Sequence, residues 1–256
     1  MDILHHKIIG KGEPLLILHG LFGMLDNWMS LAKRFGEFYE VHLIDQRNHG
    51  HSFHNDIHDY PSMAEDLIKY IEAKNLASVY LLGHSMGGKT AMLASCLRSD
   101  LIHKLIVVDI APKFYAPHHQ SIIKGLYAVK EANISSRKEA DLILSKHFDN
   151  IGIRMFLLKN LYWKTKESLD FRFNLDGIVS QIDQIGSALE DHYIYDQPTL
   201  FIDGEKSDYI LDSDMNTIEH HFPDYEIESI PNAGHWVHAE NPDYFWEKVM
   251  HFLQYS

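Results

Sequence analysis

The chain has 256 residues, of which 45% are hydrophobic, and a formal net charge of −13. This length and hydrophobic content exclude a disordered chain and predict one globular domain with one core. The acidic balance argues against a general binder of nucleic acid or of anionic membranes, because such proteins need a basic face.

The cysteine content and the apolar segments of the sequence indicate the cellular compartment to expect. The chain has one cysteine, Cys96, so no internal disulfide can form. The first residues lack the apolar stretch of a secretory signal, and no run of 18 or more apolar residues is present. We therefore expect a cytoplasmic protein without a transmembrane segment, and its oligomeric state stays open.

Segments typical of strands and helices alternate through the first part of the chain. Strands are predicted at 3–9, 15–18, 41–44, 79–82 and 105–108, and helices at 28–35, 63–73 and 89–97. Alternation of this kind predicts a parallel sheet with right-handed crossovers. The uninterrupted apolar run Leu15–Leu18 is typical of a strand that is covered on both faces.

The alternation stops after Pro112. Amphipathic helices are predicted at 121–131, from a cap at Ser136, and at 175–189, with no convincing core strand among them. Strands resume at 199–202 and 225–230, and a last helix is predicted at 243–253. We therefore expect an α/β core formed by 1–112 and 198–256. The helical insertion 113–197 is too long for an ordinary loop and would act as a lid over the sheet.

A serine lies among glycines where one of these strands is predicted to turn into a helix. Gly83-His84-Ser85-Met86-Gly87 matches the pattern G-x-S-x-G in its required strand-to-helix context. Glycines two residues to either side let strand and helix approach closely around a strained, exposed serine. Ser85 is therefore the candidate nucleophile, and the alternative is a simple helix cap.

A nucleophilic serine needs a base and two N–H donors for the oxyanion. His235 follows the predicted strand 225–230, where the base is expected, and His238 is its rival. The Met86 N–H is one expected donor, and the Leu21 N–H, in the glycine-rich loop after Leu15–Leu18, is the other. His19 is expected to brace this loop, which could otherwise be an ordinary glycine turn.

The acid that orients the histidine has two candidate positions. In the loop after strand 199–202, Ser207 occupies the slot that often holds aspartate, and Asp208 comes one residue later. Asp109 ends the apolar strand 105–108, at the sheet edge where ligands bind in open α/β folds. We favour Asp109, while Asp208 or another acid remains an alternative.

Two other sequence features are weaker evidence for a functional site. The loop Asp45-x-Arg47-x-x-Gly50-x-Ser52 is expected to be structural, although Arg47 could meet an anionic part of a substrate. The histidine pairs, among them His220-His221, lack the spacing of a metal site. We expect neither a metal nor a cofactor.

Five segments together resemble the YbfF-type bacterial esterases. They are LHGLFG with DNW (18–28), DQRNHGHS (45–52), GHSMGGK (83–89), DIAP (109–112) and AGHWVHAE (233–240). The resemblance implies an α/β-hydrolase fold, with a mostly parallel sheet flanked by helices, and a small acyl ester or acyl-CoA as substrate. It also implies that Ser85, His235, Asp109 and Ser207 are grouped at the site.

These features predict a serine hydrolase that cleaves short acyl esters or acyl-CoA thioesters through an acyl-enzyme. A C–C bond hydrolase or a perhydrolase could use the same groups. A ligand receptor built on the same fold, without turnover, is an alternative from another functional class.

Overall fold

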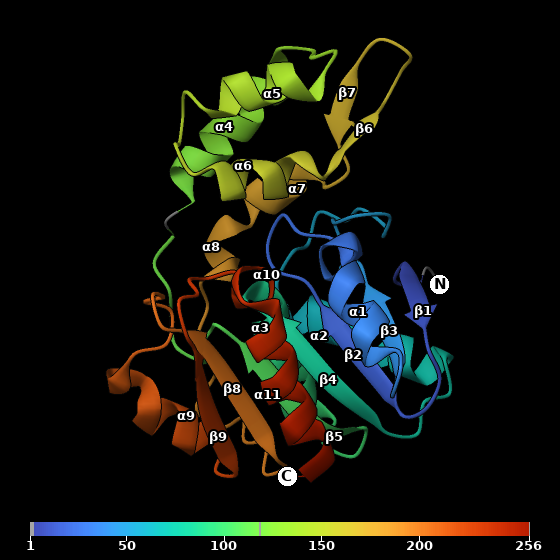
Figure 1. Cartoon of the computed structure of the whole chain (residues 1–256), viewed down its shortest axis with the longest axis vertical. Helices are drawn as coiled ribbons and strands as arrows, with labels where there is room; N and C mark the ends of the chain where they lie inside the picture. The colour runs from blue at the N-terminus through green and yellow to red at the C-terminus, as the bar shows by residue number, and fades with distance from the viewer. Residues whose placement is uncertain (1–2, 118, 256) are drawn as a thin grey trace.

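A seven-stranded sheet forms the centre of the molecule in the computed structural model, which describes residues 3–117 and 119–255 (Figure 1). Its strands lie in the order β1-β3-β2-β4-β5-β8-β9. The strands are β1 (His6–Ile9), β2 (Pro14–Leu18), β3 (Glu40–Ile44), β4 (Val79–His84), β5 (Ile102–Val108), β8 (Thr199–Gly204) and β9 (Tyr225–Ile230). All neighbours pair in parallel except β1 and β3, which are antiparallel. The predicted parallel sheet is confirmed.

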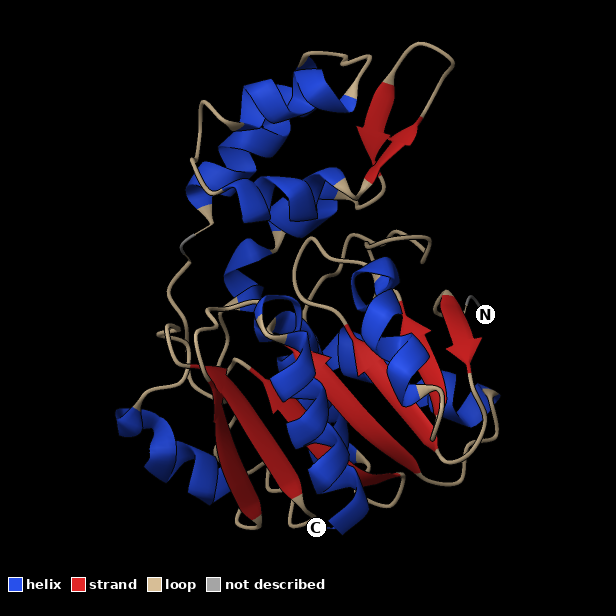
Figure 2. Cartoon of the chain, viewed as in Figure 1, coloured by secondary structure: helices blue, strands red, loops and turns tan. Residues whose placement is uncertain are grey.

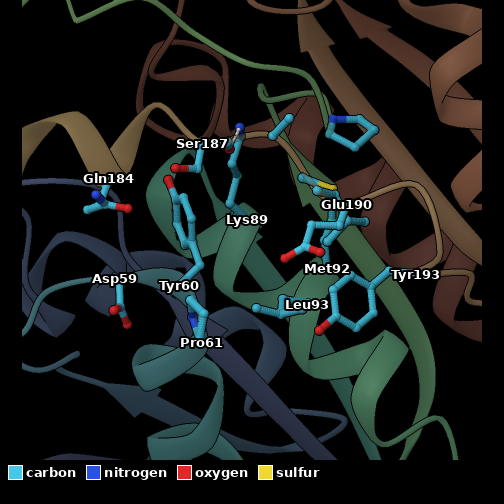
Figure 3. A pocket seen from close by; sticks show the side chains of 13 residues that line it. Asp59, Tyr60, Pro61, Lys89, Met92, Leu93, Gln184, Ser187, Glu190 and Tyr193 are labelled. Atoms are coloured by element: carbon cyan, nitrogen blue, oxygen red, sulfur yellow. Dashed lines mark hydrogen bonds between the residues drawn. The ribbon is translucent and has the colours of Figure 1, made fainter.

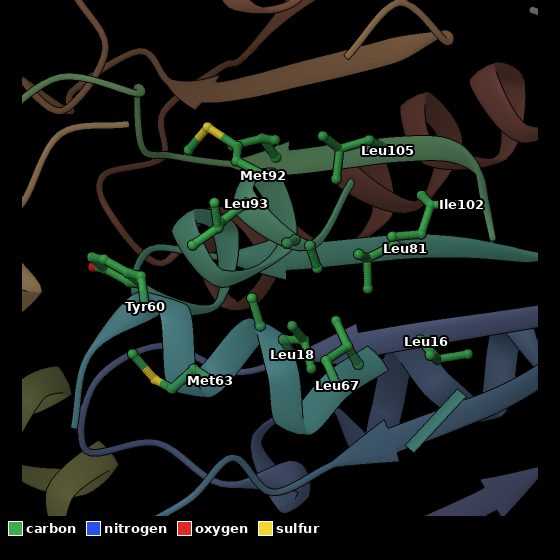
Figure 4. Packing of buried hydrophobic residues seen from close by; sticks show 14 of the residues in the cluster. Leu16, Leu18, Tyr60, Met63, Leu67, Leu81, Met92, Leu93, Ile102 and Leu105 are labelled. Carbon is green, nitrogen blue, oxygen red and sulfur yellow. The ribbon is translucent and has the colours of Figure 1, made fainter. Parts of the chain in front are cut away.

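Helices cover both faces of this sheet (Figure 2). One face packs against α2 (Tyr60–Ala73), α3 (Met86–Leu97) and α9 (Met215–His221), and the other against η1 (Leu25–Trp28), α1 (Met29–Phe35) and α11 (Pro242–Tyr255). Successive residues of a strand point to opposite faces. Leu16 and Leu18 therefore join the first cluster, shown in Figure 4, whereas Leu15 and Ile17 join the second. This double coverage explains the uninterrupted apolar run.

The start of α2 lies earlier than the predicted 63. The Asp59 side chain caps this helix, accepting a hydrogen bond from the Ser62 N–H at 2.9 Å, and Pro61 lies in the first turn. A proline is favoured there because its missing N–H has no partner in the first turn anyway. The sequence-based prediction placed the start of the helix at its first periodic apolar residue and missed Asp59 as the N-cap residue.

The segment 113–197, called the cap from here on, lies over the edge of the sheet at which β4 and β5 end (Figure 1). Its elements are α4 (Gln120–Glu131), α5 (Arg137–Leu144), α6 (Ile151–Leu158), β6 (Leu161–Trp163), β7 (Leu169–Phe171), α7 (Leu175–Ser180) and α8 (Ile182–Ile185). These elements share an apolar cluster that includes Leu126, Leu157 and Phe171, and Phe22 of the core joins it. The short hairpin β6–β7 and the helix α6 were not predicted.

The single helix predicted over 175–189 is wrong. The chain breaks between α7 and α8 at Gln181, and α8 ends at Ile185. The two connections between cap and core pair with each other instead. The Tyr115 N–H donates to the carbonyl of Gly186, and the Leu189 N–H donates to that of Pro112, both at 2.8 Å. This pairing removes the following residues from any helix.

Two short helical segments flank the carboxyl-terminal strands, η2 (Asp212–Asp214) before α9 and α10 (Val237–Glu240) before α11. Among the helices within 3–117 and 119–255, none has the combined length and apolar character of a membrane span.

Candidate active site

The chain turns sharply at Ser85, between β4 and α3. Ser85 has φ 54° and ψ −118°, a backbone conformation that residues with a Cβ seldom adopt. A Cβ on Gly83 would lie 2.2 Å from the Gly87 carbonyl oxygen, and one on Gly87 would lie 2.6 Å from that of His19. The pattern G-x-S-x-G therefore has the steric basis that was predicted for it.

His235 lies between the serine and a buried aspartate. Its Nε2 is 3.0 Å from Ser85 Oγ, and its Nδ1 is 2.7 Å from Asp109 Oδ2. Because the carboxylate can only accept, Nδ1 carries the proton and Nε2 is left as the acceptor that faces Ser85. The Tyr209 ring stacks on the imidazole at 4.0 Å between centroids, and His84 Nε2 donates to the His235 carbonyl at 2.8 Å. These contacts fix the orientation of the imidazole.

Asp109 directly follows β5 with φ 51° and has no exposed surface. Its carboxylate accepts hydrogen bonds from Ser207 Oγ at 2.6 Å and from the Gly204 N–H at 3.2 Å. Burial raises the pKa of Asp109 to about 7, and the hydrogen bonds from Ser207 and Gly204 act in the opposite direction. These donors therefore favour the ionised form of Asp109.

The alternative acid Asp208 and the alternative base His238 do not take part in this hydrogen-bonded arrangement. Asp208 is exposed, and the carboxylate at His235 Nδ1 is that of Asp109. His238 is buried and stacks on Trp28 at 4.0 Å between ring centroids, and burial holds its pKa well below the ordinary value. The structure thus brings Ser85, His235, Asp109 and Ser207 together. Their catalytic roles remain predictions.

The two backbone N–H groups predicted to bind an oxyanion belong to residues that line one cavity. Leu21 and Met86 both line a cavity that contains Ser85. Within the described ranges, neither N–H donates a hydrogen bond to another protein group. Both are therefore available to a ligand, as the prediction for an oxyanion hole requires.

Two buried histidines hold the loop that carries Leu21. His19 Nε2 accepts from the Gln46 N–H at 3.1 Å, which confirms the bracing expected of His19. His49 was missed, although its Nε2 accepts from the Phe22 N–H at 3.0 Å. The signal was available, because His49 follows β3, the strand beside β2, so both loops leave the sheet at one edge. Burial lowers the pKa of both histidines, which keeps them neutral acceptors.

Arg47 has a structural role in the neighbouring loop. It is 7% exposed, its Nε donates to Asp66 Oδ2 at 2.6 Å, and its Nη1 donates to the Ile57 carbonyl at 3.1 Å. With its charge paired to a partly buried carboxylate, Arg47 supports the structural interpretation and not contact with an anionic substrate.

Comparisons with known proteins agree with this geometry. The family described as "alpha/beta hydrolase fold" matches residues 13–242. The chain belongs to the α/β-hydrolase family.

Individual relatives of this hydrolase extend over nearly its whole length. Esterase YbfF of Escherichia coli (strain K12) is 35% identical over 244 residues, which cover 95% of this chain and 94% of that protein. The sn-1-specific diacylglycerol lipase ABHD11 of Mus musculus is 39% identical over 249 residues, covering 93% and 80%. A solved structure of a marine microorganism esterase is 44% identical with a TM-score of 0.95 and covers 98% and 100%. The expected fold class and the resemblance to YbfF-type esterases are confirmed, and these relatives support ester hydrolysis.

Two cavities of the hydrolase meet at Ser85. The small cavity has a volume of about 30 Å³ and is bounded by Met86, Ile110, Ile182 and Ile185 among others. The large cavity has a volume of about 260 Å³ and is bounded by His235 and by mostly apolar side chains. Its apolar walls come from Phe22, Ile122, Ile153, Phe156, Leu157 and Trp236. Leu21 and Tyr209 contribute to both cavities.

Lys89 ties the cap to the helix that begins after Ser85. Its Nζ donates to the carbonyls of Lys113 and Ser187, one on each connection between core and cap. Figure 3 shows this side chain extending from α3 toward Ser187, beside a further cavity bounded by Tyr60 and Tyr193. Burial lowers the pKa of Lys89 to about 7. That cavity contains neither Ser85 nor His235, so we assign it no part in the chemistry.

Three potential metal ligands lie close together elsewhere. Ligand atoms of Asp191, His220 and His221 lie within 4.8 Å of one another near the end of α9. One ring nitrogen of each histidine already hydrogen-bonds a backbone carbonyl, at 2.9 Å for His220 and 2.7 Å for His221. Since other residues bound the two cavities at Ser85, this group has no place in the candidate active site.

Replacing Ser207 with alanine tests the support of Asp109. The variant loses one donor to the carboxylate, so the pKa of Asp109 rises further. The predicted role of Asp109 requires its anion, so activity is expected to be lost below this pKa, and the acidic limb of the pH profile of kcat/KM should move to higher pH. A lost hydrogen bond to a charged group predicts a decrease of about 10- to 100-fold near neutral pH.

The matched control for this variant is Ser207→Thr, which keeps a hydroxyl. It should return the acidic limb toward that of the wild type. An unchanged acidic limb in Ser207→Ala would mean that Ser207 does not support the ionised carboxylate.

Proposed function

We propose that this α/β hydrolase is a serine esterase that cleaves short acyl esters through an acyl-enzyme on Ser85. The hydrogen-bonded series from Asp109 through His235 to Ser85 is the observation that carries the proposal. The N–H groups of Leu21 and Met86 add support, because they have no partner among the described residues and their residues line the cavity that contains Ser85.

The first half-reaction forms the acyl-enzyme. His235 Nε2 takes the hydroxyl proton of Ser85 as Oγ attacks the ester carbonyl. The Leu21 and Met86 N–H groups donate to the oxyanion, and Asp109 stabilises the imidazolium. The protonated Nε2 then gives its proton to the departing alkoxide, and the C–O bond breaks.

The second half-reaction removes the acyl group. His235 Nε2 takes a proton from a water molecule, whose oxygen attacks the acyl carbon. The tetrahedral intermediate collapses, Ser85 Oγ leaves and regains the proton, and the carboxylic acid is released. The enzyme thus returns to its starting protonation state.

We also propose that the cap acts as a lid. Ile122 of α4, Phe156 of α6 and Ile182 of α8 line the cavities at Ser85. A cap that contributes these walls would exclude bulk water during the reaction and would have to move for substrates to enter.

Thioesters fall within the same chemistry, since a thiolate can leave in place of the alkoxide. The Mus musculus relative named above acts, by its description, on diacylglycerol. We place esters first for this chain because the relatives named above include an esterase and a lipase.

Trapping the acyl-enzyme tests the proposed function. Enzyme mixed with p-nitrophenyl acetate and quenched in acid should carry one acetyl group on the peptide that contains Ser85, detectable by mass spectrometry. Parallel reactions with acetyl-CoA and a diacylglycerol measure how far the activity extends. Tight binding without turnover would indicate a receptor, and acetylation confined to another residue would refute the assigned nucleophile.

A further inference from the structure

We propose that the small cavity holds the acyl group and the large cavity holds the leaving group. The preferred substrates are then esters of a short acyl group with a bulky apolar alcohol. This inference rests on the proposed serine-esterase mechanism and deepens it by naming the substrate class.

The position of His235 decides which cavity takes which group. In the tetrahedral intermediate, the former carbonyl carbon bears Ser85 Oγ, the oxyanion, the acyl chain and the leaving oxygen. His235 Nε2 must reach both Ser85 Oγ, at 3.0 Å, and the leaving oxygen that it protonates. The leaving group therefore extends along the side of the serine on which His235 lies.

Only one of the two cavities at Ser85 meets this requirement. The large cavity is bounded by Ser85, His235 and Trp236. The small cavity is bounded by Ser85, Met86 and Leu21, and His235 is not among its described walls. The acyl chain, which points away from the proton donor, is left with the small cavity.

The sizes of the cavities set the substrate class. At about 30 Å³ the small cavity has room for roughly two or three non-hydrogen atoms, and Ile110, Ile182 and Ile185 are among its walls. An acetyl or propanoyl group fits this space, and a hexanoyl group does not.

The chemistry of the large cavity favours an apolar leaving group. No lysine, arginine, aspartate or glutamate is among its described walls, and its volume of about 260 Å³ is several times that of the small cavity. Phe156 and Trp236, with ring centroids 5.9 Å apart, also bound a further cavity of about 490 Å³. The larger volume therefore sets a looser limit on the length of the alcohol than the small cavity sets on the acyl group.

Two ester series test this assignment with the wild-type enzyme. For acetates of straight-chain alcohols from methyl to hexyl, kcat/KM should rise about fourfold per added CH₂ until the cavity is filled. For methyl esters from acetate to octanoate, kcat/KM should fall at least tenfold between propanoate and hexanoate. The opposite pair of trends would overturn the assignment.

A matched pair of variants separates the cavities. Ile182 borders only the small cavity of the two and Ile153 only the large one, and both side chains are partly buried. Ile182→Ala should move the acyl optimum to longer chains by a shift of at least tenfold in the hexanoate-to-acetate ratio, while the slope of the alcohol series stays as in the wild type. Ile153→Ala should lower the slope of the alcohol series and leave the acyl optimum unchanged.

The pattern of failure distinguishes the two proposals. An exchange of the two effects between the variants, or equal effects of both variants on both series, refutes the assignment of the cavities while esterase activity stands. Absence of hydrolysis for every ester in both series, with the variants and the wild type showing cooperative thermal unfolding, refutes the proposed function itself.

Discussion

Replacing Ser85 with alanine is expected to lower kcat for p-nitrophenyl acetate about 10⁶-fold, because the variant lacks the hydroxyl that carries the acyl group in the proposed mechanism. His235 Nε2 faces Ser85 Oγ, and His235 lines the cavity that contains this serine. The N–H groups of Leu21 and Met86 would stay in place, so a small residual rate above that in water should remain. Release of p-nitrophenol under saturating substrate measures the effect.

Ser95→Ala provides the matched control in the same helix. Ser95 is fully buried, and its Oγ has no hydrogen-bond partner within the described ranges. Its loss should leave kcat within about twofold of the wild type. A Ser85→Ala enzyme that retained a tenth or more of the wild-type activity would place the nucleophile elsewhere.

Replacing Asp109 with asparagine is expected to lower kcat about 10⁴-fold. The amide has the shape of the carboxylate but can donate to His235 Nδ1, which favours the tautomer with its proton on Nε2. That proton faces Ser85 Oγ, so the imidazole can no longer accept the hydroxyl proton. Ser207 and the Gly204 N–H also lose the negative charge to which they donate. Steady-state kinetics between pH 6 and 9 measure the loss.

Asp208→Asn is the control that separates the two acids considered from the sequence. Asp208 is exposed and lies one residue from Ser207, whereas Asp109 is fully buried. The Asp208 variant should keep kcat within about threefold of the wild type. A large loss in Asp208→Asn together with a small loss in Asp109→Asn would reverse the assignment of the acid.

The turn that carries Ser85 was predictable because its backbone conformation is determined by residues that are close in the sequence. An apolar strand, a turn with glycines around Ser85 and a helix follow one another within a short stretch, and steric exclusion between Gly83 and Gly87 acts over the same distance. Alternating strands and helices likewise predicted the parallel sheet, since the crossover rule follows from local handedness. His235 was predicted from its place after the last strand.

The cap was predicted less well because the bounds of its elements depend on contacts between segments that are distant in the sequence. Helix α8 ends at Ile185, and the carbonyl of the next residue, Gly186, accepts from the Tyr115 N–H. The hydrophobic periodicity of the sequence cannot predict a hydrogen bond between segments that are far apart along the chain. The hairpin of β6 and β7 is short enough that its apolar residues show no clear alternation.

The sequence by itself determined the fold class, the elbow at Ser85 and the candidate base, because short-range sterics and side-chain periodicity encode them. Only the tertiary structure decided between Asp109 and Asp208 as the partner of His235. The order of β5, β8 and β9 brings the ends of these strands together, although their residues are far apart along the chain. It also decided the sizes of the two cavities, because walls from α4, α6 and α8 converge on Ser85 only after the cap has packed over the sheet.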